Sequence, residues 1–493
     1  MLNYILSCPN ILLTTVIAVL LLFMWYRRKQ YLPPGPRGVP FFGVLPFLGK
    51  WPERVLQKWS KFYGPIMTVR MGGEDYVVLN DYESVNQAFV KQHTKFSGRP
   101  PIPVIEQITE GHGIVFLDYG PLWRSQRKFG LLTLRGFGAG RRSMESRILE
   151  EVSYLNDEIR SKDGKAFDIS EILHQAVSNN ICSIVMGNRF EYDDKTFAEL
   201  LHAMKTFDDK TYAFTLQLLM LAPKLIFLPP FYFINRMFMK SVRRTLKMLR
   251  KVVDEHKQTF DKNQLRDFID AFLKETEESK NEDFSDVQLF QYVRDLFVAG
   301  TETTSSTLYW GLLCMLHYPE TQKKLRKEIF EVIGSSGSAS NDQKAEMPYM
   351  NAFIQELMRF RTLLPLNLLH KTNEDAKLNE MFIPKDTKVI CNLWAIHNDP
   401  EYWNEPEKFK PERFIHENGE FVKSYHVIPF SVGPRHCLGE QLARMELFIF
   451  LVSMLQKFEF LPDPDASELP TINDGANGAV FVAKSYQLVA REI

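Results

Sequence analysis

Cysteine is scarce in this sequence, and the motifs that most often give cysteine or histidine a structural or hydrolytic task are missing. The 493 residues include five cysteines, no two of them close together, which is typical of a protein from a reducing compartment rather than of a disulfide-bonded one. No C-x-x-C or H-E-x-x-H segment occurs, which excludes the usual spacings of structural zinc sites and zinc hydrolases. Cys182, Cys314 and Cys391 lie in apolar stretches and are predicted to be buried thiols.

A surplus of positive charge is also absent. Lysine plus arginine and aspartate plus glutamate each total 60, which argues against a nucleic-acid-binding protein because such proteins normally carry a basic surplus. No Pro/Gly/Ser-rich linker and no internal repeat divides the body of the chain. With 45% hydrophobic residues, a single large core is expected.

Helical periodicity dominates the body, and we predict one mainly α-helical domain with small β-sheets over residues 44–493. The predicted helices span residues 52–63, 82–91, 121–134, 142–161, 168–186, 195–208, 235–260, 264–276, 286–316, 319–333 and 348–361. The predicted strands span residues 66–70, 75–79 and 387–391, with a C-terminal pair near 479–490.

The N-terminal segment is a long apolar run. Residues 2–26 have no charged side chain, which predicts a transmembrane signal anchor over residues 1–26. Arg27, Arg28 and Lys29 follow at once, so the body is expected on the cytoplasmic side of the membrane. Residues 27–43 then form a basic and proline-rich hinge, which is expected to hold the domain at a fixed distance from the bilayer.

A second apolar stretch, residues 209–240, contains Pro223, Pro229 and Pro230. These prolines would break a membrane-spanning helix, although a second span is the alternative interpretation. We therefore predict a helix–loop–helix that covers a cavity and touches the bilayer surface.

The segment FSVGPRHCLGE, residues 430–440, places Cys437 among glycines and basic side chains. Arg435 and His436 are expected to favour the thiolate form of Cys437. Gly433 and Gly439 would leave room for the backbone to approach a flat, bulky group. A thiolate in such a loop suits one of two tasks, attack on a carbonyl carbon or ligation of a metal ion.

The predicted helix 286–316 contains the segment FVAGTETTSSTLYWG, which is poorly suited to a helix. A glycine within a helix is unfavourable by about 1 kcal/mol relative to alanine, and the run of threonines and serines adds to this. One interpretation is that the hydroxyl groups bond back to carbonyls one turn earlier. The other is that Gly300 lets a planar group or small ligand lie against the backbone, while Glu302 and Thr303 move protons.

Together these segments match a known family. The cysteine loop fits the pattern F-x-x-G-x-R-x-C-x-G at Phe430, Gly433, Arg435, Cys437 and Gly439. AGTETT (299–304), ELMR (356–359) and FKPERF (409–414) fit three further motifs of the same family. Along essentially its whole length the chain resembles the cytochrome P450 haem-thiolate monooxygenases, specifically the membrane-anchored, family-2-like enzymes of animal microsomes.

The resemblance implies a heme b cofactor whose iron is ligated by the thiolate of Cys437 and which activates O2. It implies that Gly300 opens a groove for O2, that Thr303 stabilises the hydroperoxo intermediate, and that Glu302 helps to relay protons from solvent. The residues implied in contact with the haem are Trp123, Arg127, Gly300, His370, Phe430, Gly433, Arg435, Cys437 and Gly439. A structural trio is implied by the motifs ELMR and FKPERF, namely Glu356, Arg359 and Arg413. The family usually has Pro-His where this chain has Leu369 and His370.

The implied activity is insertion of one atom of O2 into a small apolar molecule, by hydroxylation or epoxidation of a lipid, steroid or xenobiotic. Residues expected to line the substrate pocket are Val115, Phe116, Phe297, Ala299, Leu364, Leu368 and Ala479. Because no flavin or nicotinamide fingerprint occurs in the chain, electrons are expected from NADPH through NADPH–cytochrome P450 reductase, with cytochrome b5 as a further partner. The expected location is the endoplasmic reticulum membrane, with one span and the catalytic domain on its cytoplasmic face.

A basic run in residues 123–142 is the predicted docking patch for an acidic reductase, with a solvated helix face as the alternative. Its charged residues are Arg124, Arg127, Lys128, Arg135, Arg141 and Arg142.

Two other functions fit parts of the sequence. A cysteine hydrolase would use Cys437 as nucleophile and His370 or His397 as base, but it leaves the 299–304 motif unexplained. A haem-thiolate isomerase, a peroxygenase or a haem-binding sensor would keep the cofactor without the O2 chemistry, and would need no proton relay through Glu302 and Thr303.

Overall fold

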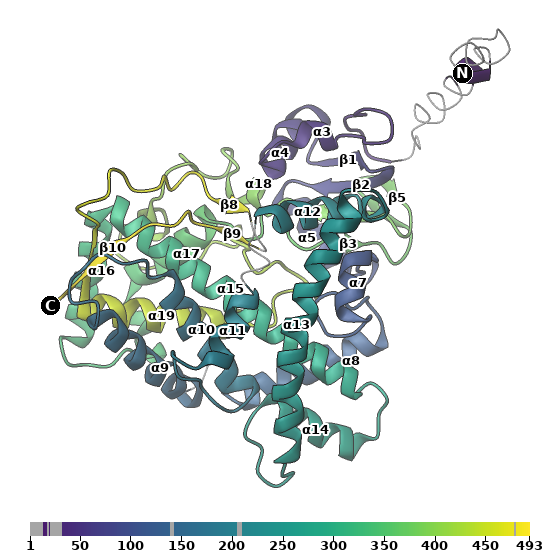
Figure 1. Cartoon of the computed structure of the whole chain (residues 1–493). Coiled ribbons are helices and arrows are strands. Elements are labelled where there is room, and N and C mark those ends of the chain that lie inside the picture. The colour runs from purple at the N-terminus through teal and green to yellow at the C-terminus, as the bar shows by residue number, and fades with distance from the viewer. Residues whose placement is uncertain (1–12, 17–18, 20–31, 139–141, 205–209, 478–479) are drawn as a thin grey trace, which may run out of the picture.

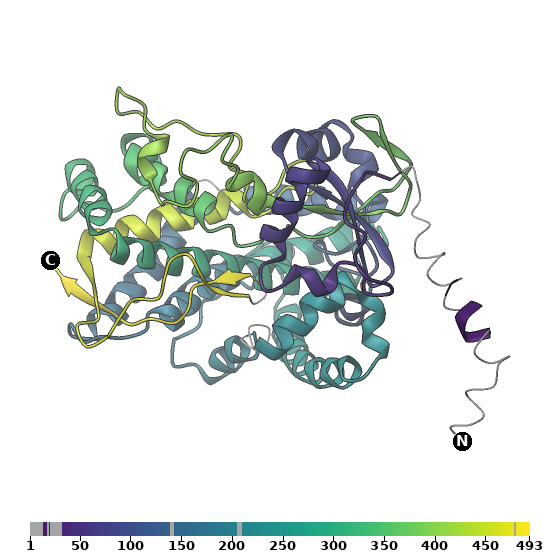
Figure 2. The ribbon, with the colours of Figure 1, turned by 90° about the horizontal axis from the view of Figure 1, so that it is seen from above.

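A computed structural model of the chain describes residues 13–16, 19, 32–138, 142–204, 210–477 and 480–493. Helices make up most of this part and surround one long central helix, while the small sheets lie toward the edges (Figure 1). The view from above places the sheet nearest the N-terminus at one side of the molecule and the strand that ends the chain at the other (Figure 2).

The predicted helices are confirmed, with ends that differ by a few residues. The α-helices are α3 (Leu45–Leu48), α4 (Pro52–Tyr63), α5 (Tyr82–Asn86), α6 (His93–Phe96), α7 (Pro103–Thr109), α8 (Pro121–Gly136), α9 (Arg142–Arg160), α10 (Ser170–Val185), α11 (Lys195–Met204), α12 (Lys210–Leu221), α13 (Phe231–Gln258), α14 (Phe268–Ser279), α15 (Asp286–His317), α16 (Pro319–Ile333), α17 (Pro348–Phe360), α18 (Leu393–His397) and α19 (Glu440–Lys457). Shorter turns include η1 (Gln87–Lys91), η3 (Pro223–Phe227), η4 (Asn341–Glu346) and η5 (Pro411–Phe414).

The main sheet has four strands, in the order β1 (Ile66–Met71), β2 (Glu74–Leu79), β6 (Lys388–Cys391) and β3 (His370–Lys371). β2 pairs with β1 in the antiparallel sense and with β6 in the parallel sense. Three two-stranded sheets complete the fold, and they pair β4 (Ala376–Leu378) with β5 (Met381–Ile383), β7 (Phe458–Pro462) with β10 (Leu488–Glu492), and β8 (Ala476–Asn477) with β9 (Phe481–Val482).

The predicted C-terminal strand pair is wrong in its partners. Strands do occur at residues 481–482 and 488–492, but the first pairs with β8 and the second with β7. The true partner of the last strand is β7, which follows directly from helix α19, and neither of these two elements was predicted. An antiparallel partner for the last strand was therefore available elsewhere in the chain.

The central helix α15 is buried along most of its length because its apolar residues are spread around the whole circumference. Its first turn is capped by Ser285, whose hydroxyl accepts a hydrogen bond from the backbone N–H of Gln288. α10 and α19 pack against it, and α19 is also apolar on all sides (Figure 1). Cys182, Cys314 and Cys391 are buried free thiols, as predicted.

The order helix–loop–helix predicted for residues 209–240 is confirmed from residue 210 onward by α12, η3 and the start of α13, while contact with a cavity and with the bilayer stays a prediction. Pro223 begins η3 and Pro230 precedes α13, so the prolines lie where the helices end. The hydroxyl of Tyr76 in β2 donates to the carbonyl of Leu221 over 2.7 Å, which ties this segment to the main sheet. Within the described part of the chain, no helix combines the length and the apolar character that a bilayer crossing needs. Most of the predicted anchor, residues 1–26, lies outside that part.

Candidate active site

The loop that carries Cys437 is held by its own backbone. The N–H of Cys437 donates to the carbonyl of Phe430 over 2.9 Å, and the N–H of His436 donates to that of Gly433 over 3.0 Å. Gly433 has φ +77°, and a Cβ at this position would lie 1.9 Å from the carbonyl oxygen of Phe89. The glycine therefore makes room for the neighbouring backbone, which is a different reason from the predicted one. The space beside Gly439 is open for about 4 Å.

The thiol of Cys437 lies at the beginning of α19, and this position determines its electrostatics. Burial raises the pKa of Cys437, while the backbone N–H groups of Gly439 and Glu440 and the charge of Arg127 lower it. The start of a helix favours negative charge in this way. The burial effect is the largest of these, and a coordinated metal ion would favour the thiolate.

The two basic neighbours of Cys437 both bind other groups. His436 pairs with Glu440, since its Nε2 lies 2.5 Å from the carboxylate. Arg435 turns away from the sulfur, and its Nε and Nη2 donate to the carbonyls of Ser97 over 2.9 Å and Leu117 over 2.8 Å. That these two side chains favour the thiolate stays a prediction, whereas the helix start and Arg127 do lower the pKa of Cys437.

Two buried side chains near this loop have an uncommitted nitrogen. Nη1 of Arg435 and Nε2 of His370 are buried with no hydrogen-bond partner among the described residues. The Nδ1 of His370 lies 2.7 Å from the carbonyl of Phe96, so the neutral ring donates there. A buried nitrogen without a partner is unfavourable, which indicates that this region is built to receive polar groups of a ligand.

Arg99 joins these residues and was not predicted. It is buried, and its Nη1 donates to the carbonyl of Leu369 over 2.7 Å. Burial lowers the pKa of Arg99 to about 10 and that of Arg435 to about 8, and Arg99 contributes to the second shift by repulsion. The pKa of His370 is lowered well below its usual value by burial and by these two cations. Such an accumulation of buried positive charge fits the two carboxylates of haem.

Trp123 and Arg127 of α8 contact the loop that carries Cys437. The indole N–H of Trp123 donates to the carbonyl of Ile114 over 3.2 Å, and the guanidinium of Arg435 lies 4.2 Å from the centre of the indole. Nη2 of Arg127 donates to the carbonyl of His436. Their predicted contact with haem carboxylates stays a prediction.

The hydroxyl groups of α15 bond back to the helix, as one of the two interpretations predicted. Thr303 donates to the carbonyl of Ala299 over 2.8 Å, and Thr307 donates to that of Thr303 over 2.8 Å. Gly300 has a packing role, because a Cβ there would lie 2.4 Å from Cδ1 of Ile181 in α10. This direction is toward a neighbouring helix, so the missing side chain gives no support to an O2 groove at Gly300.

Glu302 is directed to the α10 side of α15. One carboxylate oxygen lies 3.1 Å from Nε2 of His174 in α10. No feature of the sequence indicated this contact, because the two residues belong to helices far apart in the chain.

The structural trio has the predicted arrangement. Arg359 and Glu356 are fully buried and joined by two hydrogen bonds of 2.7 and 2.8 Å. Nε of Arg413 lies 3.1 Å from the same carboxylate. Arg359 also donates to the carbonyls of His397 and Pro406, so the trio fixes the loops before η5 in place.

The predicted substrate residues differ in their exposure. Phe297 is buried in the core, Ala299 is exposed, and the half-buried residues are Val115, Phe116, Leu364 and Leu368. Ala479 lies outside the described residues.

The basic run is divided between two directions. Arg124, Lys128 and Arg135 are exposed on α8, while Arg127 points inward to the cysteine loop. A cavity of about 120 Å³ lies between α8 and that loop, and both Arg135 and Cys437 line it. Arg135 is thus close to the loop that holds the thiol. Arg141 and the side chain of Arg142 lie outside what the structure describes.

Comparison with known proteins gives a consistent result. The family model described as Cytochrome P450 matches residues 33–490. Cytochrome P450 2U1 of Bos taurus is 38% identical over an alignment that covers 93% of this chain and 90% of that protein. Cytochrome P450 2H2 of Gallus gallus is 39% identical, with 96% and 97% covered. Cytochrome P450 2C5 of Oryctolagus cuniculus is 38% identical, with 97% and 98% covered.

Proposed function

This chain belongs to the cytochrome P450 family and is related to its animal family-2 haem monooxygenases, and we propose that it inserts one atom of O2 into a small apolar molecule. The observation that carries the proposal is the pairing of a thiol at the start of α19 with the uncommitted nitrogens of Arg435 and His370. These three groups match the iron and the carboxylates of one haem.

Bound through the thiolate of Cys437, haem supplies the binding and reductive activation of O2, and the thiolate favours cleavage of the O–O bond. Cys437 would hold the iron, and Arg435 and Arg99 would hold the carboxylates by charge-assisted hydrogen bonds. His370 donates from Nδ1 to Phe96, so its Nε2 can donate only when the ring is protonated. A carboxylate beside it favours that form against the repulsion of the two arginines.

Protons reach the site through α15 in this proposal. Glu302 is the acid that takes protons from the solvent side, and Thr303 is the hydroxyl that binds the group to be protonated. The hydroxyl of Thr303 donates to its own helix at Ala299, so it can accept a hydrogen bond from a group on the haem side while it keeps that bond.

The substrate class is small and apolar. The half-buried predicted pocket residues are Val115, Phe116, Leu364 and Leu368, and none of them is charged. Such side chains favour the apolar part of a lipid, steroid or xenobiotic, and they discriminate by shape. Hydroxylation and epoxidation both follow from the same oxygen insertion.

Electrons come from NADPH through NADPH–cytochrome P450 reductase in this proposal, with cytochrome b5 as a second donor. Arg124, Lys128 and Arg135 present positive charge on α8, and Arg135 lines the same cavity as Cys437. Charges at the edge of an interface mainly accelerate association and determine the orientation of the partner. The basic run therefore supports docking of an acidic partner on the thiolate side.

The protein is proposed to act at the endoplasmic reticulum membrane, with its catalytic domain on the cytoplasmic face. Large apolar side chains are exposed on the segment before α4 and on the segment from η3 into α13. Buried residues of these two segments pack together in one core cluster. An apolar surface of this kind favours contact with lipid. The exposed side chains are Phe41, Phe42, Phe47, Phe227, Leu228, Tyr232, Phe233 and Met237.

A cysteine hydrolase has less support. His397 has both ring nitrogens committed, since Nδ1 lies 2.7 Å from the hydroxyl of Thr362 and Nε2 accepts from the N–H of Ile428 over 2.9 Å. His370 is stacked on Phe89 and bound to Phe96. Neither imidazole is placed as a base for Cys437.

The test is the absorption spectrum of the purified protein, reduced and treated with carbon monoxide, beside that of Cys437→Ser. We expect a strongly red-shifted Soret band in the wild type and its loss in the variant. A colourless wild-type protein, or a band that survives in Cys437→Ser, would overturn the proposal.

A further inference from the structure

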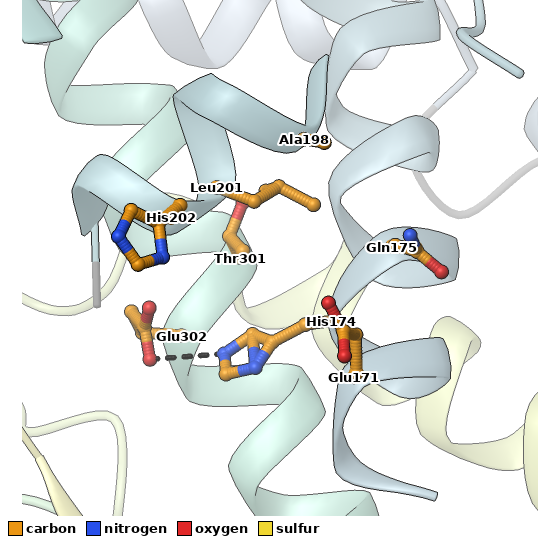
Figure 3. A pocket seen from close by; sticks show the side chains of 8 residues that line it. All are labelled: Glu171, His174, Gln175, Ala198, Leu201, His202, Thr301 and Glu302. Carbon is orange, nitrogen blue, oxygen red and sulfur yellow. Dashed lines mark hydrogen bonds and ion pairs between the residues drawn. The ribbon is translucent and has the colours of Figure 1, made fainter. Parts of the chain in front are cut away.

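The carboxylate of Glu302 lies in a polar pocket between three helices. The pocket has a volume of about 40 Å³, which exceeds the ~10–15 Å³ that one water molecule needs. Figure 3 shows the carboxylate below the ring of His202 and beside that of His174. The polar residues that line the pocket are Glu171, His174 and Gln175 of α10, His202 of α11, and Thr301 and Glu302 of α15.

The pocket becomes more polar and more exposed toward solvent. Glu171 and His202 are exposed, whereas the side chain of His174 is 19% exposed and that of Glu302 is 7% exposed. His174 is thus the group that stands between the surface residues and the buried carboxylate. Its Nε2 lies 3.1 Å from Glu302, which is hydrogen-bond distance (Figure 3).

The helices that carry the two residues are fixed against each other. The hydroxyl of Ser178 in α10 donates to that of Thr301 in α15 over 3.2 Å. Three residues after Ser178 in α10, Ile181 fills the space that a side chain at Gly300, the residue before Thr301 in α15, would need. These two contacts next to the pocket fix α10 against α15 and so determine where His174 can hold the carboxylate.

We propose that His174 positions Glu302 for proton delivery and that this pocket is the proton entrance of the enzyme. The N–H bond at Nε2 of protonated His174 breaks as the O–H bond at the Glu302 carboxylate forms, and the neutral imidazole then takes a proton from solvent. Glu302 passes its proton to the Thr303 side by rotation of its own side chain. This proposal rests on the monooxygenase function proposed above.

The test compares wild-type protein with His174→Ala, with purified reductase and an apolar substrate identified by its spectral shift. We expect His174→Ala to oxidise NADPH about 10-fold more slowly than the wild type. This factor is smaller than the ~10²–10⁴-fold that a side chain contributes when it transfers a proton to the reacting group itself. The solvent deuterium isotope effect should increase and the pH profile should change, because proton transfer becomes rate-limiting. The spectrum of the reduced carbon monoxide complex and the substrate spectral titration should be unchanged.

Two further variants separate positioning from packing. His174→Gln can still donate to Glu302 but cannot carry a proton, so it should fill the space without restoring the rate. The double variant His174→Ala/Glu302→Gln should be no slower than Glu302→Gln alone, because the two residues act in series. The control His416→Ala removes an exposed histidine after η5 and should match the wild type.

A readout independent of turnover is the ¹⁵N NMR spectrum of histidine-labelled protein. The His174 signal, assigned by its loss in His174→Ala, should shift in Glu302→Gln. An unshifted signal, or His174→Ala with wild-type rate and isotope effect, would overturn this inference while leaving the monooxygenase function intact. A wild-type protein without the red-shifted Soret band would instead overturn the proposed function itself.

Discussion

Replacing Arg359 by methionine should destabilise the fold more than any exposed charge change. The guanidinium is fully buried, makes two hydrogen bonds to Glu356 and donates to the carbonyls of His397, Pro406 and Lys408. Removal of one partner from a buried ion pair costs about 3–5 kcal/mol because the other charge stays buried and unpaired.

The geometry decides where in this range Arg359→Met should fall. Glu356 keeps Arg413 at 3.1 Å and accepts from the N–H of Lys410 over 2.9 Å, so its charge is only partly uncompensated. We therefore expect a loss of about 3 kcal/mol, at the lower end of the range. That is a large part of the ~5–15 kcal/mol by which a folded protein is stable.

Urea unfolding followed by tryptophan fluorescence measures this change. The double variant Glu356→Gln/Arg359→Met should recover part of the loss, since it leaves no unpaired carboxylate. The control Lys324→Met breaks an exposed pair with Glu412 and should change stability by less than about 1 kcal/mol. If Arg359→Met were as stable as Lys324→Met, the assignment of the trio as a structural anchor would be refuted.

Three other predictions address separate parts of the molecule. Neutralising Lys128 and Arg135 should slow reduction by the reductase at low salt and flatten its salt dependence; stopped-flow rates that keep the wild-type salt dependence would rule out the docking patch. Burial raises the pKa of Glu446 from its usual 4.5 to about 8, so the folded state retains this proton and the free energy of unfolding falls as pH rises from 4.5 to about 8. Urea titrations of Glu446→Gln at several pH values should not show this decrease. A pH profile equal to that of the wild type would contradict the prediction. Gly300→Ala should lower the free energy of unfolding by about 1–3 kcal/mol because its methyl group overpacks against Ile181. In protein that already carries Ile181→Ala, the same substitution should cost less. An equal cost in the two backgrounds would exclude the packing role.

Much of the helical fold could be predicted because its helices carry an apolar stripe with the period of an α-helix. α19 was not predicted, since its residues from Leu447 to Leu455 are buried on all sides and show no such stripe. Without α19, its continuation into β7 was also missed, and with it the partner of the last strand. Buried helices and short strands are determined by packing that local sequence does not express.

The site divides in the same way. Cys437, Glu356 and Arg359 belong to motifs whose spacing is visible in the sequence, and the trio was confirmed. Arg99 and His174 have no such signal, because their importance comes from neighbours that are distant in the chain. Gly300 and Gly433 were correctly singled out, but the groups that require a glycine there are Ile181 and the backbone of Phe89.

The electrostatics of the site connect its two halves. Burial raises the pKa of Cys437, the backbone N–H groups at the start of α19 lower it, and a metal cation bound to the sulfur would favour the thiolate. On the other side, the buried guanidinium groups of Arg99 and Arg435 repel each other and lower the pKa of His370, and carboxylates would relieve that repulsion. Haem would bring a metal cation to the sulfur of Cys437 and carboxylates to the two arginines, so one ligand would be favoured electrostatically at both places. Binding of haem should therefore stabilise the fold as a whole, and Arg435→Leu should weaken haem retention even though Cys437 is unchanged.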